Sequence, residues 1–248
     1  MNEFIGQDLR GARFDDCHLA GARFHNVSLA GARITGSYLG DVAITGEIDG
    51  LTVNGVDVTA FVHAELDRLH PDRPKMRPTD ADGFREAWSI LERLWGETVA
   101  RAKALPPEAL HERVEGEWSF VETLRHLVFA TDSWVRRAIL GDPSPWHPLD
   151  LPHDDMEASR VPPVPRDREA RPSLDEVLAL RADRQATVRS FLTDLTDDAL
   201  AGTTTPVDAP GYPESRAFPI RDILLSILNE EWQHRLYAER DLAVLASR

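Results

Sequence analysis

Apolar positions recur every five residues along the first fifty residues of the chain. A large apolar side chain stands at each of eight such positions. The residue two positions before it is small in most of the repeats. A period of five fits neither the 3.6-residue period of a helix nor the two-residue period of a strand. A short fixed period is typical of a solenoid, in which one residue of every repeat faces inward. The large residues are Leu9, Phe14, Leu19, Phe24, Leu29, Ile34, Leu39 and Ile44, and the residues before them are Gln7, Ala12, Cys17, Ala22, Val27, Ala32, Ser37 and Val42.

The five-residue pattern fades over residues 46–58, where the segments 51–53 and 56–58 predict a short final turn or strand. Residues 61–69 predict a short helix, and residues 70–78 contain three prolines, which is typical of a linker. We therefore expect a repeat domain over residues 1–60, a linker over residues 61–78 and a second domain over residues 79–248.

Four amphipathic helices are predicted in the second domain, because apolar residues recur there at spacings of three and four. Their ranges are about 82–105, 119–140, 173–195 and 219–246. Ser119 with Glu122, and Ser173 with Glu176, form Ser-x-x-Glu capping boxes at the start of two of them. Long irregular segments at 141–172 and 202–219 separate the helices, and loops of such length are usually functional or mobile. The pattern predicts a four-helix bundle.

One stripe of the last predicted helix changes from apolar to polar partway along. It consists of Ile220, Ile223, Leu224, Ile227, Glu230, His234 and Tyr237. A carboxylate on a core-facing stripe is unfavourable unless it is paired or bound to a cation. The spacing of four lets Glu230 and His234 reach one ion, and His126 in the second helix can face them. One carboxylate and two imidazoles match a three-ligand zinc site with an open position.

Other interpretations of these acidic residues remain open. In one, Glu230 forms an ordinary ion pair with an arginine near the core. In another, Glu231 is the ligand, since it stands three residues before His234, although its position directs it more toward solvent. Asp132 is a candidate to orient His126 through a hydrogen bond.

The composition narrows the classes of partner. The chain has 28 Lys and Arg against 42 Asp and Glu, a formal net charge of −14, and an acidic surface repels the phosphates of nucleic acids. Its single cysteine allows neither an intramolecular disulfide nor a cysteine-based zinc cluster. The first residues lack the pattern of a signal peptide, and no apolar run reaches the ~18 residues of a membrane span. We expect a cytoplasmic protein that binds neither nucleic acid nor membrane.

The first fifty residues, with Gly-Ala-Arg at 11–13, 21–23 and 31–33, resemble the pentapeptide-repeat family. The resemblance implies a right-handed quadrilateral β-helix, in which the large residue of each repeat fills the axis. At about four repeats per coil in that family, the eight repeats imply about two coils. The role expected of this domain is that of a cap or a dimerisation platform.

The second domain resembles the DinB-like superfamily, which includes the mycothiol-dependent maleylpyruvate isomerase metal-binding domain. Residues 117–132 and 228–242 carry the resemblance, which extends over about 80–248. It implies a divalent metal held by three ligands from the second and fourth helices. The usual ligands are three histidines, and Glu230 here stands where the first histidine of the last helix is often found. The isomerase branch is similar in using His, Glu and His, which would be His126, Glu230 and His234.

Further residues near the predicted metal are candidates for substrate binding, with structural roles as the alternative. The tryptophans, which would line a pocket or pack in the core, are Trp118, Trp134 and Trp232. The residues that would hold an anionic substrate, or form ordinary ion pairs, are Arg125, Arg235, Tyr237 and Arg240. The candidates for a lid, or for exposed loop histidines, are His147 and His153.

The resemblance implies a metal-dependent enzyme that activates a low-molecular-weight thiol, with mycothiol favoured, for transfer to or isomerisation of an electrophilic small molecule. The alternatives are a metal-dependent hydrolase and a non-catalytic metal-containing scaffold whose repeats bind another protein. Zinc is the metal that best suits two imidazoles and a carboxylate, and nickel or iron also accept them. A homodimer is the commonest symmetric assembly. No catalytic residue beyond the three ligands is identified.

Overall fold

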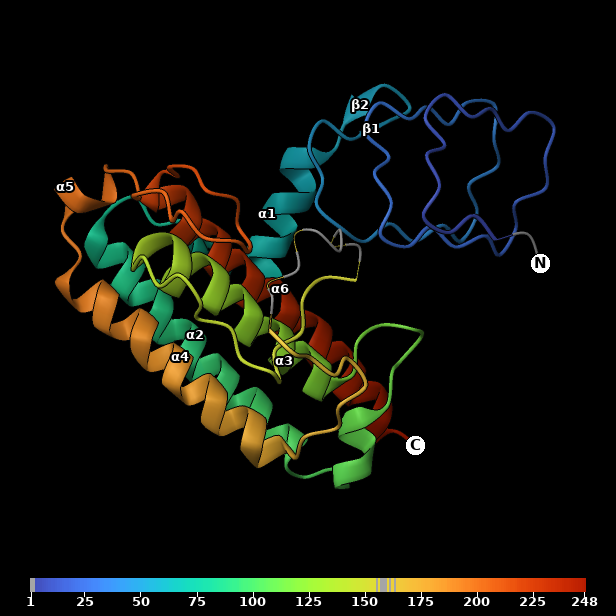
Figure 1. The fold of residues 1–248 in the computed structure, drawn as a ribbon. Helices are drawn as coiled ribbons and strands as arrows, with labels where there is room; N and C mark the ends of the chain where they lie inside the picture. The colour runs from blue at the N-terminus through green and yellow to red at the C-terminus, as the bar shows by residue number, and fades with distance from the viewer. Residues whose placement is uncertain (1–2, 155, 157–159, 161, 163) are drawn as a thin grey trace. The chain divides into compact units, whose positions relative to one another are not determined.

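The computed structural model describes residues 3–154, 156, 160, 162 and 164–248 (Figure 1). The chain forms two compact units, Met1–Phe61 and Val62–Arg248. No helix among the described residues combines the length and the apolar character needed to cross a membrane.

The first unit turns at intervals of five residues. Positive φ angles recur at this interval from Gly6 to Gly46. At Gly11, with φ +79°, a turn is closed by the Ala12 N–H, which donates to the Leu9 carbonyl at 3.0 Å. Glycine suits this position because it adopts a positive φ without steric cost. The five-residue period of the sequence is therefore a period of backbone turns.

The described residues of this unit contain no defined quadrilateral β-helix. Residues 3–50 contain no strand, and the sheet of this unit is a two-residue hairpin of β1 (Thr52–Val53) and β2 (Val56–Asp57). The large apolar side chains of the repeats are 43–65% exposed, so they do not fill a closed axis. About two coils give each side chain few neighbours to pack against, since a solenoid is stabilised by contacts between successive repeats.

The second unit is helical. Four of its helices form a ring in which each contacts two others, with α2 against α4 and α6, and α3 against the same two. This arrangement is the expected four-helix bundle (Figure 1). The first helix, α1 (Thr59–Leu69), begins in the last residues of the first unit. The others are η1 (Arg73–Met76), α2 (Ala81–Ala102), η2 (Pro107–His111), α3 (Phe120–Thr131), η3 (Asp132–Ile139), α4 (Leu174–Asp194), α5 (Asp197–Leu200) and α6 (Ile220–Ala246).

Side chains that accept from free backbone N–H groups cap the starts of three bundle helices, α2, α3 and α4. Ser119 and Ser173 accept from the backbone of Glu122 and Glu176, and each glutamate accepts from the backbone of its serine. Both predicted capping boxes are thus confirmed. Asp80 has the same function at the start of α2, where its side chain accepts from Gly83.

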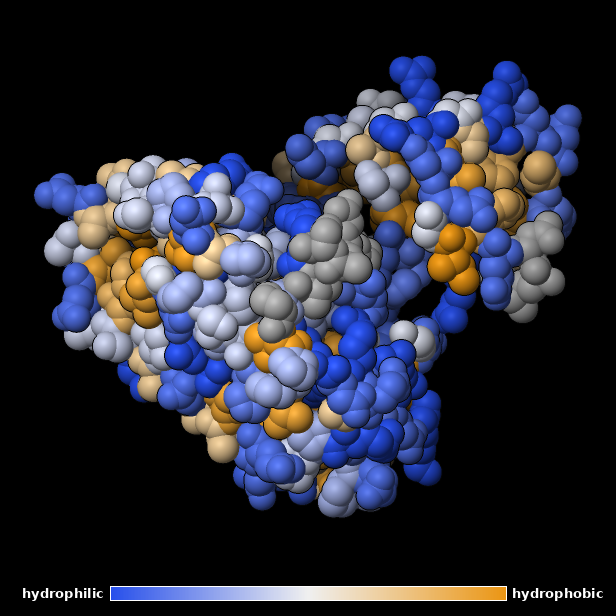
Figure 2. Space-filling model, in the orientation of Figure 1, coloured by the Kyte–Doolittle hydropathy of each residue, from blue (hydrophilic) through white to orange (hydrophobic). Residues whose placement is uncertain are grey.

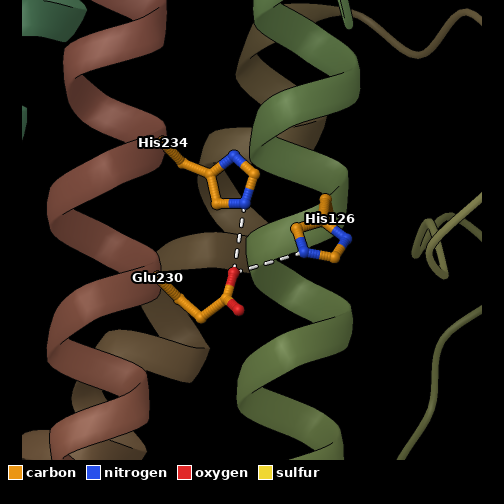
Figure 3. A group of neighbouring side chains, drawn as sticks. All are labelled: His126, Glu230 and His234. Carbon is orange, nitrogen blue, oxygen red and sulfur yellow. Dashed lines mark ion pairs between the residues drawn. The ribbon is translucent and has the colours of Figure 1, made fainter. Parts of the chain in front are cut away.

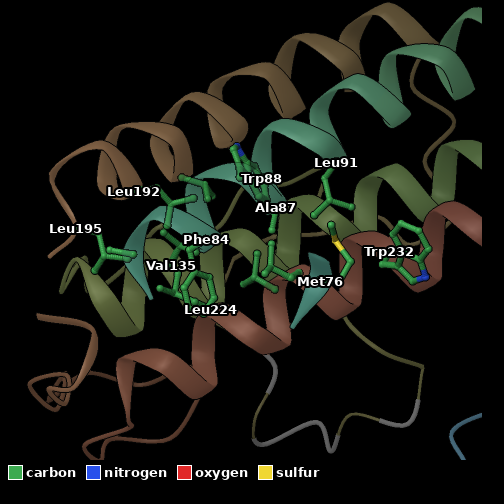
Figure 4. Packing of buried hydrophobic residues seen from close by; sticks show 14 of the residues in the cluster. Met76, Phe84, Ala87, Trp88, Leu91, Val135, Leu192, Leu195, Leu224 and Trp232 are labelled. Atoms are coloured by element: carbon green, nitrogen blue, oxygen red, sulfur yellow. The ribbon is translucent and has the colours of Figure 1, made fainter. Parts of the chain in front are cut away.

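The core of the bundle is built from apolar residues of all four long helices (Figure 4). Met76 of η1 packs in this core with 7% of its surface exposed, beside Trp88 and Trp232 in the same cluster. The short helix predicted over residues 61–69 is present within α1, and residues 62–78 of the expected linker belong to the second unit.

The second bundle helix changes its winding after Thr131. We predicted one helix over 119–140, but η3 is a π-helix, in which the Leu140 N–H donates to the Val135 carbonyl at 2.9 Å. A wider helical turn rotates the following side chains relative to an α-helix, and such segments are frequent near functional sites. The polar residues Asp132 and Arg137 of this segment are buried.

Candidate metal centre

Three potential metal ligands meet between α3 and α6 (Figure 3). Glu230 and His234 stand one turn apart on α6, and His126 faces them from α3. Their ligand atoms all lie within 4.8 Å of one another. Glu230 Oε2 is 3.1 Å from His234 Nε2 and 3.5 Å from His126 Nε2. The spacing of four therefore places both α6 side chains on the face that contacts α3.

The orientation of His126 is fixed by the chain itself. Its ring is completely buried, and Nδ1 lies 3.0 Å from the backbone carbonyl of Leu151. A carbonyl can only accept, so Nδ1 carries the hydrogen. Burial lowers the pKa of His126, which keeps the ring neutral and leaves a lone pair on Nε2. Nε2 is buried and has no hydrogen-bond partner among the described residues.

The electrostatics of the cluster suit a cation. The carboxylate of Glu230 lies between two imidazoles, with its Oε2 3.1 Å from His234 Nε2 and 3.5 Å from His126 Nε2. A carboxylate oxygen and the lone pair of a neutral imidazole thus face each other in a largely buried place, which is unfavourable without a positive charge between them. Two imidazole nitrogens and one carboxylate oxygen are donors that zinc and similar divalent metals accept. The residues present therefore fit a divalent metal ion.

Aromatic rings surround the cluster. The centroids of Trp118 and His153 each lie 4.6 Å from that of His126. Trp118 is also stacked on His234 at 6.0 Å, and Tyr237 meets His234 edge-on at 5.9 Å. The side chains of Glu230 and His234 remain 29% and 18% exposed, so the cluster is accessible on the α6 side. Three of the predicted substrate or lid residues, namely Trp118, Tyr237 and His153, thus lie beside the cluster.

Two aromatic residues near the cluster were missed by the sequence analysis. Phe129 lies 6.3 Å from His126 and 6.0 Å from Tyr212, and Tyr212 lies 6.4 Å from His153, between ring centroids. Trp134 extends this group, since its ring is 5.6 Å from that of Tyr212. Phe129 has the helical spacing of a core residue, and Tyr212 lies in an irregular segment, so neither carried a signal that separated it from ordinary packing.

Several predicted substrate residues have other partners. Trp232 is buried in the bundle core, where it contacts His70. Arg235 is also buried and lies 3.6 Å from Glu239, on the same helix. Arg240 pairs with its neighbour Asp241 at 2.7 Å. Trp232 and Arg235 thus point into the bundle rather than toward the three ligands, whereas the guanidinium of Arg240 also lies 5.6 Å from the ring of Tyr237 beside the cluster.

Two further predicted residues, one in a helix and one in a loop, also make other contacts. Arg125, expected to hold an anionic substrate, is 1% exposed and donates to backbone carbonyls. His147, expected in a lid, accepts through Nδ1 from the backbone N–H of Leu149 at 3.1 Å. Among the ring contacts of the described residues, none joins His147 to His126 or His234.

Glu231 and Asp132 are buried ion-pair residues. Glu231, which we expected to face solvent, is 2% exposed, and both of its oxygens accept from Arg181 at 2.8 Å. Asp132, a candidate to orient His126, instead accepts two hydrogen bonds from Arg184 at 2.9 Å. The Leu151 carbonyl, which has no signature in a sequence, orients His126 in its place.

Comparison with known families gives two matches. A model described as the DinB superfamily matches residues 90–238, which is more than half of the chain and includes all three residues of the cluster. A model of pentapeptide repeats matches residues 4–42 with eight copies. No curated protein and no solved structure matches the chain.

Proposed function

The chain belongs to the DinB superfamily, and on that premise we propose that it is a metal-dependent enzyme acting on a small thiol. It activates a low-molecular-weight thiol, with mycothiol favoured, for transfer to or isomerisation of an electrophilic small molecule. The observation that carries the proposal is the buried Nε2 of His126, a lone pair held toward Glu230 and His234 with no hydrogen-bond partner among the described residues.

His126, Glu230 and His234 would hold the metal, with zinc the preferred ion. A divalent metal bound there supplies a positive charge that favours the thiolate over the thiol at neutral pH. The protein fixes the three donors on two packed helices, so little rearrangement accompanies metal binding. The ring of Trp118 lies beside both imidazoles, 4.6 Å from that of His126 and 6.0 Å from that of His234.

The exposed side of the cluster is where thiol and electrophile would enter. Glu230 and His234 are accessible there, and Tyr237 lies beside His234. Burial raises the pKa of Tyr237, so its hydroxyl stays protonated and can donate a hydrogen bond to a bound substrate. In this proposal Trp118 and Tyr237 position the substrate, and His153 closes the site above His126.

The test uses the full chain loaded with Co²⁺, whose visible absorption reports its ligands. We expect mycothiol to add a sulfur-to-cobalt charge-transfer band in the wild-type protein and none in His234→Ala. The loaded protein should then conjugate mycothiol to a chromogenic electrophile. Absence of the band together with turnover that needs no thiol would replace this proposal with a metal-dependent hydrolase.

A second function is favoured for the repeat unit by its exposed apolar side chains (Figure 2). Phe14 and Phe24 are 53% and 62% exposed, and apolar surface of this kind commonly marks a protein-binding surface. We propose that the repeats form a homodimer contact. Light scattering should give twice the chain mass for the wild type and the monomer mass for Phe14→Ser/Phe24→Ser. A monomeric wild-type protein would refute the homodimer.

A further inference from the structure

Arg125 connects two distant parts of the long segment between η3 and α4. Its Nε donates to the Leu149 carbonyl at 2.8 Å, and Nη2 donates to the Asp167 carbonyl at 2.8 Å. Nη1 donates to the carbonyls of Arg168 and Ala170 at 3.0 and 2.8 Å. One guanidinium thus bonds to Leu149 and to three residues near the end of the segment through four backbone oxygens.

The part of the segment that Arg125 holds is the part that orients His126. Leu151 follows Leu149 by two residues, and its carbonyl accepts from His126 Nδ1 at 3.0 Å. The Leu151 N–H donates to the backbone carbonyl of Arg125 at 3.2 Å. Asp150 between them is completely buried and pairs with Arg166. The chain that leads into the Leu151 carbonyl is therefore held by the side chain of Arg125 at Leu149 and by its backbone carbonyl at the Leu151 N–H.

Burying the guanidinium of Arg125 costs free energy, because the charge loses its contact with water. Arg125 is 1% exposed, and burial lowers its pKa. A buried charge is unfavourable unless its hydrogen bonds are complete, and the carbonyls of this segment supply them. Arg125 and His126 are adjacent on α3 and contact the same stretch of chain, at Leu149 and Leu151. A change at Arg125 can therefore alter the position of His126.

We propose that Arg125 is a positioning residue of the metal centre: it fixes the Leu151 carbonyl, which holds His126 with Nε2 facing Glu230 and His234. The segment around Leu151 then keeps one position relative to His126. This inference rests on the proposed metal binding, but the orientation of His126 is testable without metal.

Arg137 provides a matched control. It is also 1% exposed, it lies in the helical segment that continues α3, and its guanidinium donates to backbone carbonyls. Those carbonyls belong to Pro143, Val207, Ala209 and Pro213, so Arg137 holds a different part of the chain from the one that meets His126. Replacement of either arginine removes a comparable set of hydrogen bonds.

The experiment compares Arg125→Met and Arg137→Met in the full chain. Zinc affinity is measured by competition with a chromophoric chelator, and the tautomer of His126 is read from ¹⁵N NMR of the metal-free protein. We expect Arg125→Met to weaken zinc binding by about 10- to 100-fold, the range for loss of a group that orients a ligand. Its His126 should lose the pure Nδ1–H tautomer. Arg137→Met should lower the melting temperature while both other readouts stay at wild-type values.

Equal weakening of zinc binding in both variants, or an unchanged tautomer in Arg125→Met, would overturn the proposal. If Arg125→Met does not fold, Arg125→Lys retains the charge with fewer donors and should give an intermediate zinc affinity. A wild-type protein that binds no zinc refutes the proposed function, and the tautomer measurement then still decides the role of Arg125.

Discussion

Glu230 and Glu231 are adjacent in the chain and have opposite expected phenotypes. Glu231 and Arg181 are 2% and 3% exposed and share two hydrogen bonds of 2.8 Å. Glu231→Leu leaves the Arg181 guanidinium buried without its partner, which costs about 3–5 kcal/mol. For a unit of this size about 2–4 °C is lost per kcal/mol, so the melting temperature should fall by roughly 6–20 °C. Zinc binding to the folded fraction should persist.

The matched variant is Glu230→Gln, which should lose zinc and keep most of the stability of the metal-free protein. Its side chain is 29% exposed, so the amide remains in contact with water. The free energy of unfolding is measured by urea denaturation of metal-free protein, because bound metal would add its own stabilisation.

A double variant isolates the ion pair. Replacing both partners of a buried pair by apolar residues is often neutral or stabilising by about 1–4 kcal/mol. Arg181→Met/Glu231→Leu should therefore recover most of what Glu231→Leu loses. A loss below about 1 kcal/mol in Glu231→Leu, or no recovery in the double variant, would contradict the assigned pairing.

Three further outcomes follow from the structure. Ser119→Ala removes the capping box of α3 and should cost about 1 kcal/mol in urea denaturation, so an unchanged midpoint would contradict the cap. A Cβ at Gly211, where φ is +139°, would lie 2.1 Å from the Trp146 ring; Gly211→Ala should therefore destabilise by about 1–3 kcal/mol, and an unchanged melting temperature would contradict that packing. A chelator should lower the melting temperature of the zinc-loaded wild type by the equivalent of about 2.7 kcal/mol at a free zinc concentration 100 times the dissociation constant. The chelator should leave the melting temperature of His234→Ala unchanged. Equal shifts in both proteins would show that it acts at a place other than the three-residue cluster.

The elements that follow local rules were predictable from the sequence. The four bundle helices begin within a residue or two of their expected positions, because periodicity and capping boxes depend on residues close in the chain. The proximity of His126, Glu230 and His234 was also predictable, since a spacing of four on α6 and one histidine on a facing helix are enough to bring them together.

Features that depend on distant partners were not predictable. Glu231 has the same residue type as Glu230, and only the position of Arg181 on α4 shows that it is a buried pair. We predicted that Arg125 binds an anion, but it donates to backbone carbonyls. Every residue has a backbone carbonyl, so the sequence does not show which ones an arginine will contact. The five-residue period coincides with backbone turns, but whether the coils close into a β-helix depends on packing between successive repeats, which the period does not report.

The most direct test of the central claim is the metal content of the full chain purified without a histidine tag, beside His234→Ala. The account predicts one divalent metal ion per wild-type chain and loss of that ion in the variant. Wild-type protein that holds no metal after reconstitution with zinc, or a variant that retains it, would contradict the account. His126, Glu230 and His234 would then be a structural polar cluster.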